Sequence, residues 1–307
     1  MRYKLSAPAT LHTTIQLPAS KSISNRALIL HALAQGHIAP SNLSDCDDTR
    51  VMIKALDGNP GHIDILAAGT AMRFLTAYLS VTPGTRIITG TERMQQRPIR
   101  ILVDALRELG AQIEYAGKEG FPPLRITGTE LTGEEISLAG NVSSQYISAL
   151  LMIGPILKNG LRLNLTGEII SRPYINLTLQ LMKEFGADAA WSSESSITVR
   201  PGKYRDIPFT VESDWSGASY WYQMVALIQD NEKKESTKTK IKLPGLLPRS
   251  YQGDSRGAEI FAKLGVHTTY TDQGVILTKM GTPVTCLKED LVDIPDLAQT
   301  FVVTCCL

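Results

Sequence analysis

The sequence has no Cys-x-x-Cys pair, little histidine and almost no net charge. Its four cysteines are too scattered among 307 residues for a disulfide framework or a zinc site, so we expect a reducing cytoplasm. Its five histidines form no spaced cluster of ligands. A net charge of +1 provides no overall field for nucleic acid or a membrane surface. These absences argue against metal-binding, disulfide-rich and nucleic-acid-binding classes.

Long apolar runs are missing too. Met1 to His12 contains no apolar signal core. The longest mostly apolar stretch, Tyr146 to Leu157, includes Gly154 and Pro155 and is too short to span a bilayer. We therefore expect a cytoplasmic globular chain with no membrane partner. Its length is large for one core, so two domains are the default.

Polar segments that carry cations precede several predicted helices. Pro18 to Arg26 places small hydroxylated residues, Lys21 and Arg26 at the start of a helix that continues to Ala34. The first N–H groups of a helix have no internal partner, and together with the helix dipole they attract anions. The simpler interpretation of this segment is a Ser-capped amphipathic helix.

Four further segments repeat this arrangement. Gly69 opens an apolar helix with Arg73 in its first turn, and a glycine lets a ligand approach the backbone closely. Arg97 precedes a proline, the favoured first residue of a helix. The other two segments are Asn141 to Tyr146 and Ser171 to Tyr174. Each alone is more simply a surface cap, but five together predict one site for a small ligand with several anionic groups.

A helix, a glycine and a short strand recur three times along the chain. The three helical faces end at Gly110, Gly186 and Gly265, and the residues after each glycine alternate as in a strand. This recurrence indicates a repeated α/β module. The most charged run, Asn231 to Lys240, is expected to be a solvated hairpin tip or loop.

These motifs resemble those of the EPSP synthase family, the 3-phosphoshikimate 1-carboxyvinyltransferases. The most specific are Lys-Ser-x-Ser-x-Arg at residues 21–26 and Ala-Gly-Thr-Ala-Met-Arg at residues 68–73. The other matching segments are Arg93 to Ile99, Ser143 to Tyr146, Ser171 to Tyr174, Asp214 to Tyr220, Gly253 to Arg256 and Ile294 to Asp296. The related UDP-N-acetylglucosamine enolpyruvyl transferase begins with Lys-Asn and uses a loop cysteine, whereas Ser22 follows Lys21 here.

The resemblance implies an α/β protein with the two-domain enolpyruvyl transferase fold, an inside-out barrel built from repeated βαβαββ units. Residues 21–211 would form one complete domain, and residues 1–20 with 212–307 an incomplete second one. The family's later Lys-Glu-Thr-Asp-Arg segment is absent, and Leu297 to Leu307 looks like a helix stopped in mid-course. The chain is therefore expected to be a fragment that is inactive alone.

The implied reaction transfers the enolpyruvyl group of phosphoenolpyruvate to the 5-hydroxyl of shikimate 3-phosphate, with no cofactor or metal. Shikimate 3-phosphate would contact Lys21, Ser22, Arg26, Ser143, Ser144, Gln145, Ser171, Tyr174 and Asp296. Phosphoenolpyruvate, or the inhibitor glyphosate in its place, would contact Lys21, Gly69, Arg73, Arg97 and Gln145. Lys21 and Asp296 are the candidate catalytic residues. Without the resemblance, a helix N-cap is the favoured role for Asp296.

Some assignments stay open. Ala67 stands where the family usually has asparagine, which removes one amide from the phosphoenolpyruvate loop. Asp47 and Asp48 are expected at a helix start, and Asp214 at the hinge or close to the cleft. Three functions compete: an EPSP synthase, the UDP-N-acetylglucosamine transferase, and a non-catalytic protein that binds a phosphate ligand. The complete protein is expected to be a monomer whose partners are small molecules only.

Overall fold

The chain folds into two compact units. The computed structural model describes residues 11–58, 60–228 and 239–306. The central unit comprises Ala19–Val211, and the split unit comprises Met1–Pro18 and Glu212–Leu307. The run predicted as a hairpin tip lies largely outside the described residues. In the described part, no helix is long and apolar enough to cross a membrane.

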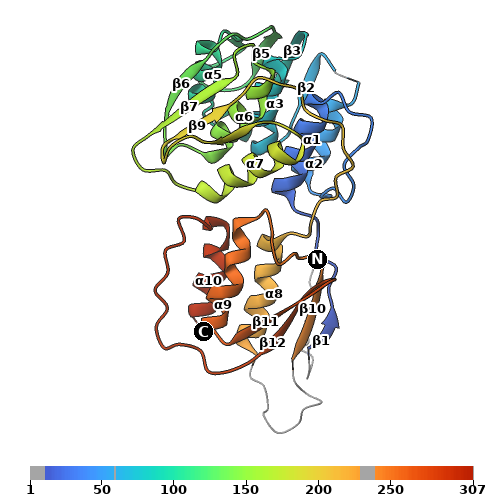
Figure 1. Cartoon of the computed structure of the whole chain (residues 1–307), viewed down its shortest axis with the longest axis vertical. Helices are drawn as coiled ribbons and strands as arrows, with labels where there is room; N and C mark the ends of the chain where they lie inside the picture. Colours follow the sequence, from blue (N-terminus) through green and yellow to red (C-terminus); the bar gives the residue numbers. More distant parts are fainter. Residues whose placement is uncertain (1–10, 59, 229–238, 307) are drawn as a thin grey trace. The chain divides into compact units, whose positions relative to one another are not determined.

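Three separate four-stranded sheets share one topology, and the described strands close no single barrel (Figure 1). In each sheet the first two strands pair in parallel and the other two pairings are antiparallel. The first sheet of the central unit has the order β2 (His62–Asp64), β3 (Gly84–Thr89), β5 (Leu124–Gly128), β4 (Gln112–Tyr115). The second has the order β6 (Glu135–Ala139), β7 (Leu161–Thr166), β9 (Ser196–Val199), β8 (Ala189–Trp191). The sheet of the split unit has the order β1 (His12–Thr14), β10 (Lys240–Pro244), β12 (Gly274–Lys279), β11 (Val266–Thr271).

The predicted module is confirmed at all three places. Helices α5 (Arg100–Glu108), α7 (Arg172–Glu184) and α9 (Gly257–Lys263) each lead through a glycine to strands β4, β8 and β11. Gly110, Gly186 and Gly265 have φ values of 102°, 89° and 81°. Glycine is favoured there because a side chain would strain the left-handed backbone that ends each helix.

The helices of the central unit surround α3. They are α1 (Lys21–Leu33), α2 (Asp47–Leu56), α3 (Gly69–Ser80), α4 (Glu92–Gln95), α5 (Arg100–Glu108), α6 (Ser144–Ile153) and α7 (Arg172–Glu184), with the 3-10 turn η1 (Gly154–Ile156). Helix α3 packs against α1, α2, α5, α6 and β5, and every residue except Tyr78 is buried. Its apolar residues Met72, Phe74 and Leu75 are among the most deeply buried side chains.

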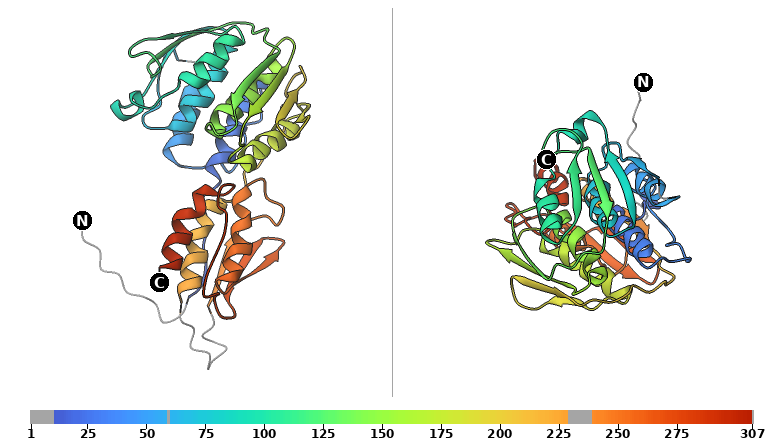
Figure 2. Two further views of the ribbon diagram at one scale, coloured as in Figure 1. Left: turned by 90° about the vertical axis from the view of Figure 1, so that its left-hand side faces the viewer. Right: turned by 90° about the horizontal axis from the view of Figure 1, so that it is seen from above.

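The split unit has its own core. Its helices are α8 (Trp215–Leu227), α9 (Gly257–Lys263) and α10 (Ala298–Cys305), with the 3-10 turns η3 (Gly253–Arg256) and η4 (Pro295–Leu297). Figure 2 shows the three helices together beside the sheet. The rings of Tyr222, Phe261 and Phe301 follow one another at centroid distances of 5.2 and 4.6 Å. Phe301 is buried, whereas Val302 and Val303 are exposed on α10.

Candidate active site

Arg26 is the centre of the first cationic cluster. It lies on the second turn of α1, whose N-cap Ser20 accepts a hydrogen bond from Ile23 N at 3.5 Å, so the predicted serine cap is confirmed. The Arg26 side chain is only 3% exposed. Arg26 donates three hydrogen bonds: from Nε to Thr178 Oγ1 at 2.7 Å, from Nη1 to the Ser22 carbonyl at 2.9 Å and from Nη2 to Ser148 Oγ at 3.1 Å. These bonds fasten α1 to α6 and α7.

No described partner of Arg26 is a carboxylate. Burial lowers the pKa of Arg26 to about 10, and the Tyr174 hydroxyl opposes this shift. The guanidinium also lies 5.2 Å from the centroid of the Phe74 ring. Arg26 is therefore charged at neutral pH although it is buried among neutral groups. A buried charge of this kind favours an anionic ligand, because an ion pair offsets part of its desolvation cost.

A second cationic cluster lies at the start of α3. A Cβ atom added to Gly69 would lie 2.4 Å from Arg97 Nη1 and 2.8 Å from Arg73 Nη1. Arg73 Nη1 donates to the Gly69 carbonyl at 2.8 Å, and within the described chain the buried Arg73 Nε has no hydrogen-bond partner. Two guanidinium groups thus meet over a backbone that carries no side chain.

The electrostatics of this cluster favour an anion. Burial lowers the pKa of Arg73, while Tyr146 raises it and the charge of Arg97 lowers it further. The carboxylate of Asp48 makes only the last and smallest contribution, which raises the pKa. Like charges held this close repel each other unless an anion lies between them. The arrangement is suited to a phosphate or carboxylate group.

Helix α6 connects the two clusters. Gln145 Nε2 donates to Thr70 Oγ1 at 3.3 Å, and the Tyr146 hydroxyl donates to the Pro98 carbonyl at 2.8 Å. Two residues further on, Ser148 accepts the bond from Arg26. Early turns of α1, α3, α6 and α7 therefore lie at one place in the central unit. The structure brings the starts of α1, α3 and α6 together, and one anion site formed by all five segments stays a prediction.

The serines differ in what their hydroxyls do. Ser143, the N-cap of α6, accepts a hydrogen bond from Gln145 N at 3.4 Å, and Ser144 follows it half-buried. Ser171 precedes α7 with φ 55° and ψ 34°, and its side chain makes no capping bond. A left-handed serine is uncommon, and such conformations are found frequently at functional sites. Tyr174, in the first turn of α7, is half-buried.

The turn at Arg97 differs from the sequence prediction. Pro98 does not begin a helix, because α5 begins at Arg100 and its N-cap Ile99 has φ −133°. Ile99 N donates to the Gly120 carbonyl, and the Pro98 carbonyl accepts from Tyr146. These tertiary hydrogen bonds hold Pro98 and Ile99 outside the helix, so the helix begins two residues later than predicted.

Two candidate catalytic residues lie in different units. Lys21 is exposed on the first turn of α1 in the central unit. Asp296 is exposed in the 3-10 turn η4 of the split unit, directly before α10. The N-cap positions of η4 and α10 are Ile294 and Leu297, so the helix N-cap considered for Asp296 is not its role.

The remaining carboxylates of the motifs lie at helix N-termini. Asp47 and Asp48 lie in the first turn of α2, as predicted. Asp214 is the N-cap of α8, and its Oδ2 accepts a hydrogen bond from Gly217 N at 2.9 Å. All three act favourably on the N-terminal helix dipole.

Several residues of the site were not singled out from the sequence. Ser148 and Thr178 hold Arg26, and Tyr146 and Thr70 connect the second cluster. The sequence feature that could identify such residues is a hydroxyl at a buried position of an apolar helix, as with Ser148 between Ile147 and Ala149. Buried hydroxyls require partners, but the sequence does not say which.

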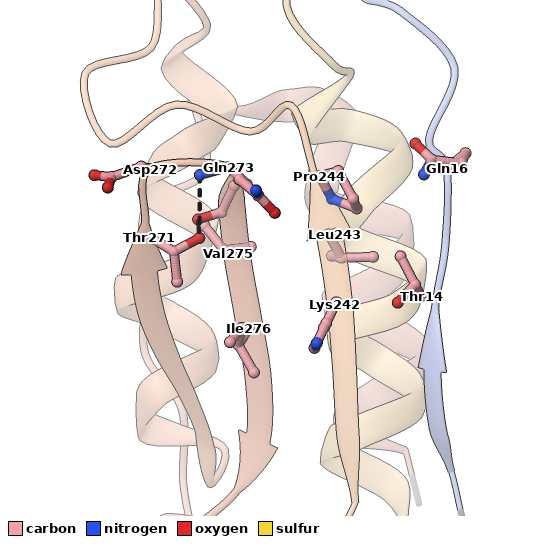
Figure 3. Close-up of a pocket in the computed structure, with 11 residues that line it drawn as sticks. Thr14, Gln16, Lys242, Leu243, Pro244, Thr271, Asp272, Gln273, Val275 and Ile276 are labelled. Carbon is pink, nitrogen blue, oxygen red and sulfur yellow. Dashed lines mark hydrogen bonds between the residues drawn. The ribbon is translucent and has the colours of Figure 1, made fainter.

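A hollow in the split unit has no comparable chemistry. It has a volume of about 680 Å³ and lies over β10 and β12 (Figure 3). Its charged lining residues are Lys242 and Asp272, and none of the predicted site residues lines it. Among the described residues, no three His, Cys, Asp or Glu side chains gather where they could hold a metal ion.

The repeated sheets and the cationic helix starts define the class of the enolpyruvyl transferases. The family model for EPSP synthase (3-phosphoshikimate 1-carboxyvinyltransferase) matches residues 5–58 and 59–307, and the chain belongs to this family.

Similar proteins agree with the family match. A 3-phosphoshikimate 1-carboxyvinyltransferase of Bacteroides fragilis is 71% identical over 307 residues, which are 100% of this chain and 73% of the relative. One of Shewanella pealeana is 37% identical over 319 residues, covering 95% of this chain and 72% of the relative. A solved EPSP synthase of Acinetobacter baumannii has the same fold, with a TM-score of 0.75 and 20% identity, covering 95% of this chain and 71% of that one.

Proposed function

We propose that the central unit binds both substrates of the family's reaction, the transfer of an enolpyruvyl group from phosphoenolpyruvate to shikimate 3-phosphate. The observation that carries the proposal is the meeting of Arg73 and Arg97 over Gly69, next to a second buried cation at Arg26. Two polyanionic substrates require two such clusters, because each must be neutralised for the substrates to approach each other.

The cluster around Arg26 is the proposed subsite for shikimate 3-phosphate. Its hydroxyl and amide groups lie on loops and first turns of α1, α6 and α7. The proposed contacts are Lys21, Ser22, Arg26, Ser143, Ser144, Gln145, Ser171 and Tyr174, with Asp296 from the split unit. The uncapped Ser171 hydroxyl supports this assignment, because it is not used by its own helix.

The cluster over Gly69 is the proposed subsite for phosphoenolpyruvate. Gly69, Arg73 and Arg97 would hold its anionic groups, with Lys21 and Gln145 beside them. Lys21 and Gln145 are shared by the two proposed subsites, and the bond from Gln145 to Thr70 lies at the start of α3. A shared residue is expected where two substrates must react with each other.

The reaction needs proton transfer and charge stabilisation rather than a redox step. The 5-hydroxyl gives up its proton as its oxygen forms a bond to C2 of phosphoenolpyruvate, while C3 gains a proton. Phosphate then leaves C2 and a proton leaves C3, so the double bond is restored. Lys21 and Asp296 are the proposed groups for these proton transfers.

The two units are the proposed domains of the fold, with boundaries near Ser20 and Val211. We further propose that the complete protein acts as a monomer in the cytoplasm, with small molecules as its only partners. The four cysteines support a reducing compartment, because all of them are free.

Phosphate release tests the proposed function. The parent protein should release phosphate from phosphoenolpyruvate when shikimate 3-phosphate is present and should not do so with UDP-N-acetylglucosamine. Release that depends on the UDP-sugar would assign the chain to the related transferase. Binding of shikimate 3-phosphate by the parent protein without any release would instead support a non-catalytic binding protein.

A further inference from the structure

The arginine pair over Gly69 requires something to hold it in place. Arg97 is exposed and lies on the short turn between α4 and α5, outside any helix. Its charge lowers the pKa of Arg73, so the two groups repel each other before a ligand arrives. A mobile arginine would move away from its neighbour into water, and it would then have to be ordered again at each binding event.

Tyr146 contacts both sides of this pair. Its hydroxyl donates to the Pro98 carbonyl at 2.8 Å, which fixes the peptide between Pro98 and Ile99, one residue beyond Arg97. The centroid of its ring lies 5.8 Å from Arg73 Cζ, and Tyr146 raises the pKa of Arg73. The side chain itself is only 7% exposed. A buried tyrosine on α6 thus joins the turn that carries Arg97 to the helix that carries Arg73.

We propose that Tyr146 is a positioning residue that holds the guanidinium groups of Arg73 and Arg97 at the spacing needed to bind one anionic substrate. The inference rests on the proposed function, because it takes phosphoenolpyruvate as that substrate. Tyr146 acts in two ways. The hydroxyl anchors the backbone next to Arg97, and the electron-rich face of the ring stabilises the cation of Arg73.

A purely structural role makes a different prediction. Tyr204 lies in the same unit, is 5% exposed, and also donates its hydroxyl to a backbone carbonyl, that of Met152 at 2.8 Å. Tyr204 lies on none of the segments that carry the arginines. Loss of either hydroxyl removes one buried hydrogen bond and should lower stability by a similar amount. Only the loss at Tyr146 should change binding.

The test compares Tyr146→Phe with Tyr204→Phe. Calorimetry with phosphoenolpyruvate alone, so that no turnover occurs, should show about three- to tenfold weaker binding for Tyr146→Phe, the range for one buried hydrogen bond. Tyr204→Phe should bind as the wild type does, and both variants should keep their affinity for shikimate 3-phosphate. Equal phosphoenolpyruvate affinity of Tyr146→Phe and the wild type would overturn the inference alone. A wild-type protein that binds no phosphoenolpyruvate would overturn the proposed function.

Two further measurements separate positioning from general weakening. In an Arg97→Ala background, the additional Tyr146→Phe change should have little effect on phosphoenolpyruvate affinity, because the group being positioned is gone. Without any ligand, the Nε–Hε resonance of Arg97 in ¹⁵N-arginine protein should show greater mobility in Tyr146→Phe. Fully additive effects on affinity, or an unchanged Arg97 resonance, would contradict a positioning role.

Discussion

Arg26 shows how one residue can serve both packing and binding. Its guanidinium joins three helices through Thr178, Ser148 and the Ser22 carbonyl, so the same charge that would meet a substrate also orders the site. Arg86 is a contrast, because it is just as buried and, among the described residues, donates only to the carbonyls of Thr82 and Pro83. The two arginines differ in what surrounds them rather than in burial.

We expect Arg26→Ala to lose about 2–4 kcal/mol of shikimate 3-phosphate binding, the scale for truncating a desolvated charge partner. The variant should also unfold at a lower temperature, because two hydrogen bonds to neighbouring helices and one within α1 are lost. Calorimetry and thermal unfolding measure the two effects. Arg86→Ala is the control, and it should lose stability while keeping its affinity. An unchanged affinity in Arg26→Ala would assign Arg26 to packing alone.

Gly69→Ala should reduce binding of glyphosate more than binding of phosphoenolpyruvate. The added methyl group would lie 2.4 Å from Arg97 Nη1, so the long Arg97 side chain must move. The fold should survive, since the groups displaced are the ends of flexible side chains. Inhibition curves for glyphosate and KM for phosphoenolpyruvate give the comparison. Gly61→Ala, with open space around its Cβ position, is the control. Equal losses for both ligands would contradict the placement of Gly69.

At this scale the sequence singled out candidate residues at local signals and missed the distant partners that hold them. Lys21, Gly69 and Arg97 were recognisable because each stands at a local signal, a helix start or a turn. The partners Ser148 and Thr178 were not, because each meets Arg26 across more than one hundred residues of sequence. Local patterns carry no information about which distant hydroxyl a buried cation will meet.

The start of α8 lies in a network of polar side chains in the split unit. Glu212 Oε1 accepts hydrogen bonds from Ser250 Oγ at 2.6 Å, Tyr251 N at 3.1 Å and Gln252 Nε2 at 3.0 Å. Gln252 Oε1 in turn accepts from Trp215 N at 3.0 Å. This network connects the loop before η3 to the first turn of α8. Glu212 Oε2 is buried and has no hydrogen-bond partner among the described residues.

Glu212 should make stability depend on pH. Burial raises the pKa of Glu212 above 4.5, although its hydrogen bonds oppose the shift. The folded state therefore holds this proton more tightly than the unfolded state does. Stability contributed by the protonated carboxyl is present below pH 4.5 and is lost as pH rises through the higher folded pKa.

Glu212→Gln should consequently raise the melting temperature at pH 7, and the gain should vanish as pH falls to 4.5. Thermal unfolding across this range measures it. Glu168→Gln, at an exposed glutamate, should change nothing. A lower melting temperature for Glu212→Gln at pH 7 would show that the ionised carboxylate is stabilising instead.

Elements were predicted well where the signal was periodic. The three helix–glycine–strand modules and the helices at Lys21, Gly69 and Ser144 agree with the structure. The start of α5 was predicted two residues too early, because the preference of proline for a first helical position yielded to the bonds of Pro98 and Ile99 with distant partners. The helix propensity of a residue sets a helix boundary only where no tertiary contact opposes it.

At the scale of the whole molecule, the chain has two separate cores. The split unit packs Trp215, Tyr222 and Phe261 in its own cluster, and the central unit packs around α3. Sequence length alone predicted two domains. The assignment of residues to each domain came from the family resemblance. The chain spans 73% of the length of its Bacteroides relative.

Two cores should give two unfolding transitions, and shikimate 3-phosphate should raise only one of them. A ligand at one hundred times its Kd stabilises the unit that binds it by about 2.7 kcal/mol. Calorimetric scans with and without the ligand test this. Trp191→Phe confines the tryptophan fluorescence to Trp215 and Trp221 of the split unit, whose midpoint should stay fixed. A single transition that moves as a whole would show that the units unfold together.

Strand β1 has a consequence for how the protein is made. Its partner is β10, where His12 pairs with Lys240, so more than two hundred residues leave the ribosome before the strand can be paired. During that time the central unit is synthesised completely and can fold first, because both of its sheets are made from its own residues. During translation, the residues around Arg26 can therefore fold before β1 pairs with β10.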